Sequence, residues 1–103
     1  MLFIKILLLS LLLVFSSSVL ADPKMDLGLD VYNNKAQCGV CHTLQAAGSK
    51  GQIGPNFDQL KPQTPQIIYT VTNGIGVMPA YDGTLTTEEI EAVAHYIFNS
   101  TNK

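Results

Sequence analysis

The 103-residue sequence predicts an all-α domain of three main helices joined by long loops. Three observations lead to this fold class. Apolar residues recur at helical spacing in three separate segments of the chain. Glycine and proline interrupt the segments between them, so these connections are expected to be irregular. No segment alternates between apolar and polar residues over a length that would form a regular strand.

The N-terminal residues 1–21 have the features of a secretory signal peptide. Lys5 precedes the segment Ile6–Phe15, which is apolar apart from one serine, and Val19-Leu20-Ala21 ends in a small residue. This order of charged, apolar and small residues is the pattern that signal peptidase recognises. The apolar run is shorter than the about 20 residues of a membrane span. We therefore expect cleavage after Ala21, a periplasmic protein and no permanent membrane span, with an uncleaved N-terminal anchor as the alternative.

Residues 22–103 are predicted to form one small domain. They contain five lysines, no arginine and eight carboxylates, which gives a formal charge of −3. Such a composition provides neither a basic surface for nucleic acid nor a polybasic membrane patch. A domain of this size has a marginal core and usually needs a further stabilising group.

The first helix is predicted over Met25–Lys35. Gly28 lowers the helix propensity by about 1 kcal/mol relative to alanine, but it would let another helix cross closely. The face expected to pack inward comprises Leu27, Val31 and Asn34, flanked by Leu29 and Tyr32.

The middle of the chain combines an irregular segment with a second helix. Thr43–Pro62 is rich in glycine and proline and is expected to be a loop. A helix can begin at Thr64 or Pro65 and run through Val71, with Asn73-Gly74 as its stop signal.

The last helix has the clearest signals. It follows Ile75–Tyr81, an apolar segment that contains helix-breaking residues. Thr86 and Glu89 form a capping box, which predicts the start of the helix. The apolar face that follows at helical spacing consists of Ile90, Val93, Ala94 and Ile97, widened by Tyr96 and Phe98.

Cys38-Gly39-Val40-Cys41-His42 matches the C-x-x-C-H pattern of covalent c-type haem attachment. Two thiols three positions apart can each form a thioether with a vinyl group of one haem, and the histidine can then bind its iron. Cys38 and Cys41 are the only cysteines in the chain. The sequence therefore predicts one haem c, around which the helices and long loops wrap. A buried ligand would also explain long loops in so small a domain.

His42 and Met78 are the predicted axial ligands of the haem iron. Met78 lies in a loop between glycine-rich residues and a proline, which could hold its thioether rigidly. The alternative is that Met78 only fills a gap in the core. His95, within the last helix, is interpreted as a surface or helix-packing residue, and Met25 lacks a comparable loop. A histidine and methionine pair leaves no open coordination position and favours electron transfer.

With these motifs, the sequence resembles the class I c-type cytochromes of the small bacterial and photosynthetic kind. The resemblance covers nearly all of residues 22–103. Its motifs, in order, are Gly28 with Tyr32, Cys38-Gly-Val-Cys-His42, Gly54-Pro55-Asn56, Met78-Pro-Ala-Tyr81 and the terminal segment Leu85–Tyr96. The cytochrome c fold is what this resemblance implies.

The resemblance also implies roles for single residues. The carbonyl of Pro55 would accept a hydrogen bond from the second ring nitrogen of His42, which orients the ring and raises its basicity. The alternative is that Gly54-Pro55 is only a turn. The first helix would cross the last one, with Gly28 and Tyr32 packed against Val93, Ala94 and Tyr96. Because arginine and tryptophan are absent, the candidates for holding the haem propionates are Tyr69, Tyr81 and Asn56.

The predicted function is that of an exported one-electron carrier, not an enzyme, with redox proteins as donor and acceptor in a respiratory chain. The alternative is a dedicated haem subunit of a periplasmic oxidoreductase, such as a sulfite- or alcohol-oxidising enzyme. The protein would thus be a monomer or part of a hetero-complex. Exposed apolar residues near the haem edge, with Val77, Ala80 and Ile53 as candidates, would favour a partner surface.

A dithiol redox protein or a metal site using Cys38, Cys41 and His42 is a more remote alternative. The βαβ setting of thioredoxin-like enzymes is absent from the predicted elements. The ligand spacing also differs from that of structural zinc sites.

Overall fold

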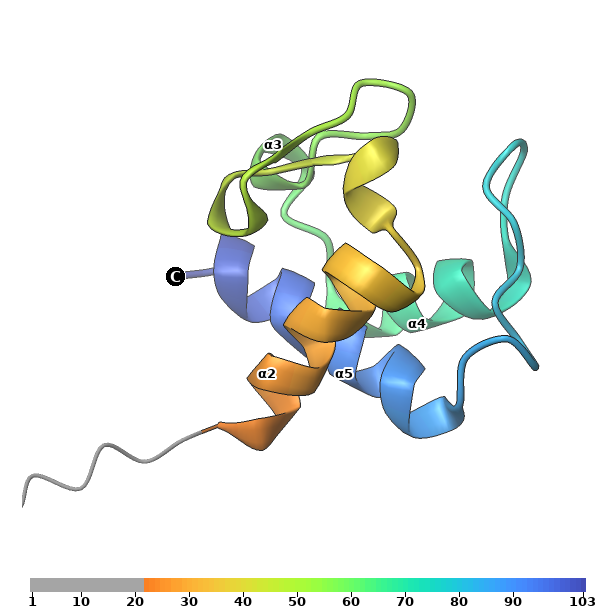
Figure 1. Cartoon of the computed structure of the whole chain (residues 1–103). Helices are drawn as coiled ribbons and strands as arrows, with labels where there is room; N and C mark the ends of the chain where they lie inside the picture. The colour runs from red at the N-terminus through yellow and green to blue at the C-terminus, as the bar shows by residue number, and fades with distance from the viewer. Residues whose placement is uncertain (1–21) are drawn as a thin grey trace, which may run out of the picture.

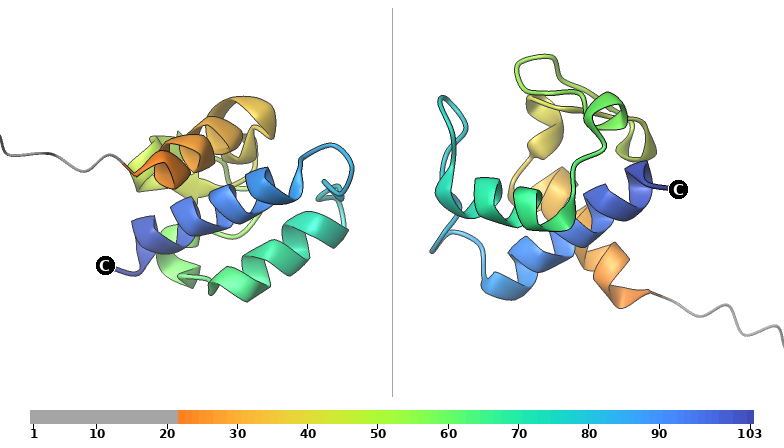
Figure 2. Two further views of the ribbon diagram at one scale, coloured as in Figure 1. Left: turned by 90° about the horizontal axis from the view of Figure 1, so that it is seen from below. Right: turned by 180° about the vertical axis from the view of Figure 1, so that it is seen from behind.

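The computed structural model describes residues 22–103, and the predicted signal peptide lies outside this part of the chain. Three main helices form the domain: α2 (Pro23–Asp30), α4 (Thr64–Asn73) and α5 (Thr87–Thr101) (Figure 1). The predicted all-α class is confirmed. Helix α5 lies between α2 and α4 (Figure 2), and both of these helices pack on it. Within residues 22–103, none of the helices has the length and apolar character needed to cross a bilayer.

The first helix begins at an aspartate cap and ends in a widened turn. The Asp22 carboxylate accepts hydrogen bonds from the backbone N–H groups of Lys24 and Met25. After α2 the chain continues as a π-helical turn, Val31–Lys35, in which the Ala36 N–H donates to the Val31 carbonyl. The predicted helix is thus present, but its last turn is not α-helical.

This wide turn changes which side chains face inward. The sequence pattern placed Asn34 on the buried face and Tyr32 at its edge. In the structure Asn34 is exposed, whereas Val31 and Tyr32 are fully buried. A π-helical turn contains more residues than an α-helical turn, so side chains beyond it rotate away from the positions that a period of 3.6 predicts.

Helices α2 and α5 cross at Gly28, as the sequence indicated. A Cβ atom at Gly28 would collide with the Ala92 carbonyl and with the Cβ of Tyr96. The rings of Tyr32 and Tyr96 also meet at this crossing, with centroids 6.0 Å apart. Glycine is therefore required here because the two backbones approach too closely for any side chain.

The start of α5 has the predicted capping box. The Thr86 hydroxyl accepts from the Glu89 N–H at 3.1 Å, and the Glu89 carboxylate accepts from the Thr86 N–H at 2.9 Å. The Glu89 carboxylate also forms a 2.7 Å ion pair with Lys35. The buried face of α5 contains Ile90, Ala92, Val93, Ala94, Tyr96 and Ile97, so the predicted stripe is confirmed and extended.

The segment Thr43–Pro62 is more ordered than its sequence suggested. Strands β1 (Thr43–Leu44) and β2 (Ser49–Lys50) pair antiparallel, with Leu44 opposite Ser49. A 3₁₀ turn (Gln45–Ala47) joins these strands, and the short helix α3 (Phe57–Leu60) follows. Elements of two to four residues are too short to produce a sequence period, so the pattern could not show them.

Candidate haem site

The Cys-x-x-Cys-His segment forms a tight turn beside a cavity. Cys38–Val40 is a 3₁₀ turn, and the Cys38 carbonyl accepts from the N–H groups of Cys41 and His42, at 3.2 and 3.0 Å. Gln37 precedes the turn with a left-handed backbone, at φ 51°. This sharp change of direction ends the π-helical turn and starts the cysteine-containing turn, so that both thiols and the imidazole reach the same cavity.

Two adjoining cavities lie between this turn, α4 and the loop after α4. Their volumes are about 340 and about 200 Å³, and the larger one is within the range of pockets that bind small molecules and cofactors. Six residues line both cavities: Cys38, His42, Pro55, Val71, Ile75 and Met78. The structure thus brings all five predicted site residues together, because Cys41 lines the larger cavity with them.

His42 is held in a form that can bind a metal. Its side chain is buried, and its Nδ1 lies 2.7 Å from the Pro55 carbonyl oxygen. A carbonyl can only accept, so Nδ1 carries the proton and donates it. In the neutral ring with this tautomer the lone pair is on Nε2, and within residues 22–103 no hydrogen bond to Nε2 is present. Neutral imidazole with one free nitrogen is the form that coordinates metals.

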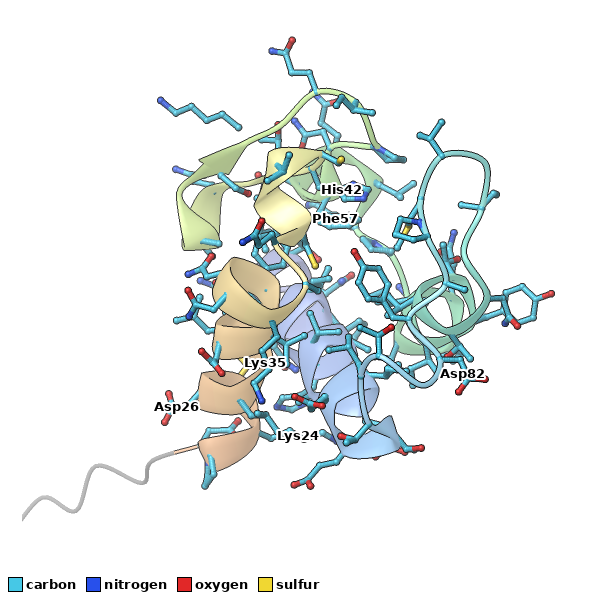
Figure 3. All side chains as sticks on the ribbon, turned by 45° about the vertical axis from the view of Figure 1, so that its right-hand side comes forward. Lys24, Asp26, Lys35, His42, Phe57 and Asp82 are labelled. Carbon is cyan, nitrogen blue, oxygen red and sulfur yellow. The ribbon has the colours of Figure 1, made fainter. Side chains whose placement is uncertain are left out.

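The His42 ring is also fixed by packing. The Phe57 ring stacks on it with centroids 4.2 Å apart and planes inclined by 14° (Figure 3). A Cβ atom at Gly54 would collide with the ring, and the Gly54 N–H donates to the Cys41 carbonyl at 2.7 Å. Gly54-Pro55 therefore does more than form a turn, since it lies directly against the imidazole. Phe57 was not among the residues predicted for the site, although it directly follows the Gly54-Pro55-Asn56 motif.

The surroundings of the two thiols do not favour dithiol chemistry. Cys38 and Cys41 form no disulfide, and burial raises the pKa of the Cys38 thiol to about 11. Reactive dithiol enzymes instead lower the pKa of the attacking cysteine. Residues 22–103 contain no group of three or more histidine, cysteine or acidic side chains arranged for a metal ion. This geometry therefore supports neither a dithiol redox protein nor a metal site formed by Cys38, Cys41 and His42.

Met78 lies in a short, hydrogen-bonded turn that also lines the cavities. The backbone groups of Ile75 and Met78 bond to one another at 3.1 and 2.9 Å, and Gly76 between them has φ 55°. The Tyr81 hydroxyl donates to the Ala36 carbonyl at 3.2 Å. The loop that contains Met78 is thereby tied to the segment immediately before the first cysteine.

The other residues considered from the sequence lie elsewhere. His95 does not line the cavities; its Nε2 is 3.1 Å from an Asp22 carboxylate oxygen, as expected for a helix-packing residue. Asn56 caps α3 by accepting from the Gln59 N–H, and Tyr69 is exposed. Of the three candidates for holding propionates, only Tyr81 lines a cavity.

The sequence and fold both match known cytochromes. Residues 23–97 match the family described as cytochrome c oxidase, cbb3-type, subunit III. Cytochrome c6 of Tetradesmus obliquus is 34% identical over 87 residues, covering 75% of this chain and 93% of that protein. Chloroplastic cytochrome c6 of Chlamydomonas reinhardtii is 33% identical over 100 residues, covering 86% and 63%.

A solved structure agrees with these matches. The crystal structure of the c-type cytochrome SorU from Sinorhizobium meliloti superposes with a TM-score of 0.74 at 44% identity, covering 81% of this chain and 97% of that one. The predicted cytochrome c fold is thereby confirmed. A covalent haem c also suits the two free thiols and the free imidazole nitrogen beside one apolar cavity. The chain therefore belongs to the monohaem class I c-type cytochromes of the cytochrome c6 and cbb3 subunit III family, and it is an electron carrier rather than an enzyme.

Proposed function

We propose that this chain is an exported one-electron carrier whose haem iron is bound by His42 and Met78 and whose haem is attached through Cys38 and Cys41. The observation that carries the proposal is the 2.7 Å contact between His42 Nδ1 and Pro55. It leaves Nε2 available in a cavity that Met78 also lines. When bound, the haem supplies a single-electron couple, and a histidine and methionine pair raises its potential and closes both axial positions.

Met78→Ala tests the ligand assignment, with Met25→Ala as the control. Met25 packs against the hydrophobic core and does not line the cavities. The first variant should lose the sulfur-to-iron absorption band and show a lower reduction potential, because the thioether favours reduced iron. The control should keep both properties. A Met78→Ala protein with the native band and potential contradicts the assignment.

Covalent attachment has a direct chemical test. Holoprotein produced in an export-competent host is denatured and extracted with acidified acetone, which removes haem that is not covalently bound. The haem should remain with the protein through both thioethers. Release of the haem contradicts the role given to Cys38 and Cys41.

Export with cleavage after Ala21 is proposed from the order of charged, apolar and small residues over 1–21. Cleavage there would leave Asp22 in place as the side-chain cap of α2. Mass spectrometry of the protein from the periplasm should give Asp22 as the first residue. A mass that retains residues 1–21 would instead support the uncleaved anchor.

Electron transfer is proposed to occur through an uncharged apolar rim at the cavity mouth, formed by Ile53, Ile75, Val77 and Ala80. Val77 is 89% exposed, and Ile53 and Ile75 are also largely exposed; three of the four line the larger cavity. Transient redox contacts are small, so a rim of this kind suits a diffusing carrier. Isolation of the native protein from its periplasm distinguishes a free electron carrier from a haem subunit of an oxidoreductase. Recovery as a free monomer indicates the carrier, and stoichiometric recovery with an enzyme indicates the subunit.

A further inference from the structure

A partly buried hydrogen-bond network lies behind His42, on the side of its main chain. The Oγ of Ser49, in β2, is 2.9 Å from the His42 carbonyl oxygen, 2.9 Å from the Tyr32 hydroxyl and 3.0 Å from the Leu44 nitrogen. The Tyr32 hydroxyl is itself 3.4 Å from the His42 carbonyl. Three segments of the chain thus converge on the backbone of the predicted iron ligand.

The directions of these hydrogen bonds follow from the groups involved. The Leu44 N–H can only donate, and the His42 carbonyl can only accept. Ser49 has a single hydroxyl proton, and the His42 carbonyl at 2.9 Å is a nearer acceptor for it than the Leu44 carbonyl at 3.5 Å. With that proton directed to His42, the Ser49 oxygen accepts from the Leu44 N–H and from the Tyr32 hydroxyl. Tyr32 itself is fully buried, so its hydroxyl depends on these protein partners.

The side chains of Ser49 and Tyr32 also pack against the turn that contains Cys38 and Gly39. A Cβ atom at Gly39 would lie 2.6 Å from the Cβ of Ser49 and 3.5 Å from Cε1 of Tyr32. Pairing of β1 with β2 sets Ser49 opposite Leu44, which holds the hydroxyl at this position. The network therefore contacts both the turn that contains Cys38 and the residue that follows Cys41.

We propose that Ser49, assisted by Tyr32, is a positioning residue for His42. It fixes the main chain of the histidine, while Pro55 and Phe57 fix its ring, so that the direction of Nε2 is determined from both ends of the residue. This inference rests on the proposed role of His42 as an iron ligand. Loosening the main chain would weaken the hydrogen bond from Nδ1 to Pro55, which lowers the basicity of the ligand.

The test compares Ser49→Ala, Tyr32→Phe and a matched control, Thr43→Val, in the holoprotein. The control removes the 2.8 Å hydrogen bond from the Thr43 hydroxyl to the Gly51 carbonyl. That bond lies in the same loop but does not involve His42. Reduction potential is measured for all variants, and the iron–histidine stretching band is measured by resonance Raman on the reduced proteins in a Met78→Ala background.

Ser49→Ala should raise the reduction potential and lower the frequency of the iron–histidine band. Hydrogen exchange at the Leu44 amide should accelerate by about tenfold, the effect of losing one net hydrogen bond. Tyr32→Phe should shift the potential and the band in the same directions by smaller amounts. Thr43→Val should lower thermal stability while both iron properties stay at their native values.

Equal losses of stability in Ser49→Ala and Thr43→Val, with native potential and band in both, would overturn the inference. If Ser49→Ala yields no holoprotein, Tyr32→Phe decides, because it removes only one hydroxyl group; native iron properties in that variant also overturn the inference. A Met78→Ala protein with native Ser49 whose reduced haem is five-coordinate and high-spin but gives no iron–histidine band would instead show that His42 is not the ligand, which overturns the proposed function and this inference together.

Discussion

Substitution of Gly54 by alanine should disturb both the stability and the haem environment of this cytochrome. Gly54 has no left-handed backbone, so alanine fits the main chain and the effect comes from its methyl group alone. The new Cβ would collide with Cε1 of His42 and would lie 2.8 and 2.9 Å from its Nδ1 and Nε2, whereas ordinary contact begins at 3.4 Å. The shortfall is largest at Cε1, so the imidazole must move by about 1 Å to regain ordinary packing distances.

The energetic cost follows from this displacement. It is large enough to lengthen the 2.7 Å bond between His42 and Pro55 beyond the usual limit of about 3.2 Å. Overpacking costs about 1–3 kcal/mol, and the weakened hydrogen bond adds about 0.5–1.5 kcal/mol. A total of about 2–4 kcal/mol corresponds, in a domain of this size, to a fall in Tm of at least about 8 °C.

The assay is thermal unfolding of the holoprotein together with its reduction potential and iron–histidine band. Gly48→Ala is the matched control. Gly48 lies in the same loop at φ 67° with open space around it, so alanine there costs about 1–2 kcal/mol of backbone strain and should leave the iron properties unchanged. Native Tm, potential and band in the Gly54→Ala protein would refute the reasoning, because they would mean that the ring does not lie against Gly54.

Two further predictions concern the helix crossing and the acid stability. Gly28→Ala should lower Tm in spite of the better helix propensity of alanine, because the methyl group meets the backbone of α5; a native or higher Tm in thermal unfolding would contradict this close crossing. The ion pair with Lys35 holds the pKa of Glu89 below its ordinary value of 4.5. A group with a lowered folded pKa stabilises the protein above its unfolded pKa, and this contribution is lost as the pH falls through the folded value. Stability followed by Tm should thus decline below pH 4.5, and Lys35→Met should reduce that decline; an identical acid profile in the variant would show that the pair contributes nothing.

Local chemistry made much of this protein predictable. The capping box at Thr86 and Glu89 acts over three residues, and the apolar face of α5 repeats at one helical period, so neither needs the rest of the fold. The attachment motif is likewise contained in a single turn. By contrast, the π-helical turn made the prediction for Asn34 wrong, while Val31 and Leu27 pack inward as expected. A change in helical period leaves no mark in the pattern of apolar residues.

The haem motif, the methionine candidate and the helical frame could be identified from the sequence alone, since each is encoded in neighbouring residues. The contact of His42 with Pro55 was implied by the family resemblance. The stacking of Phe57 and the hydrogen bond from Ser49 became visible only in the folded chain. The structure also showed that Asn56 caps α3. These residues are 7 to 15 positions away from His42 in the sequence, and the structure brings them to it through a loop whose strands are two residues long. Such contacts depend on how the loop folds back on the cysteine turn, which no local period records.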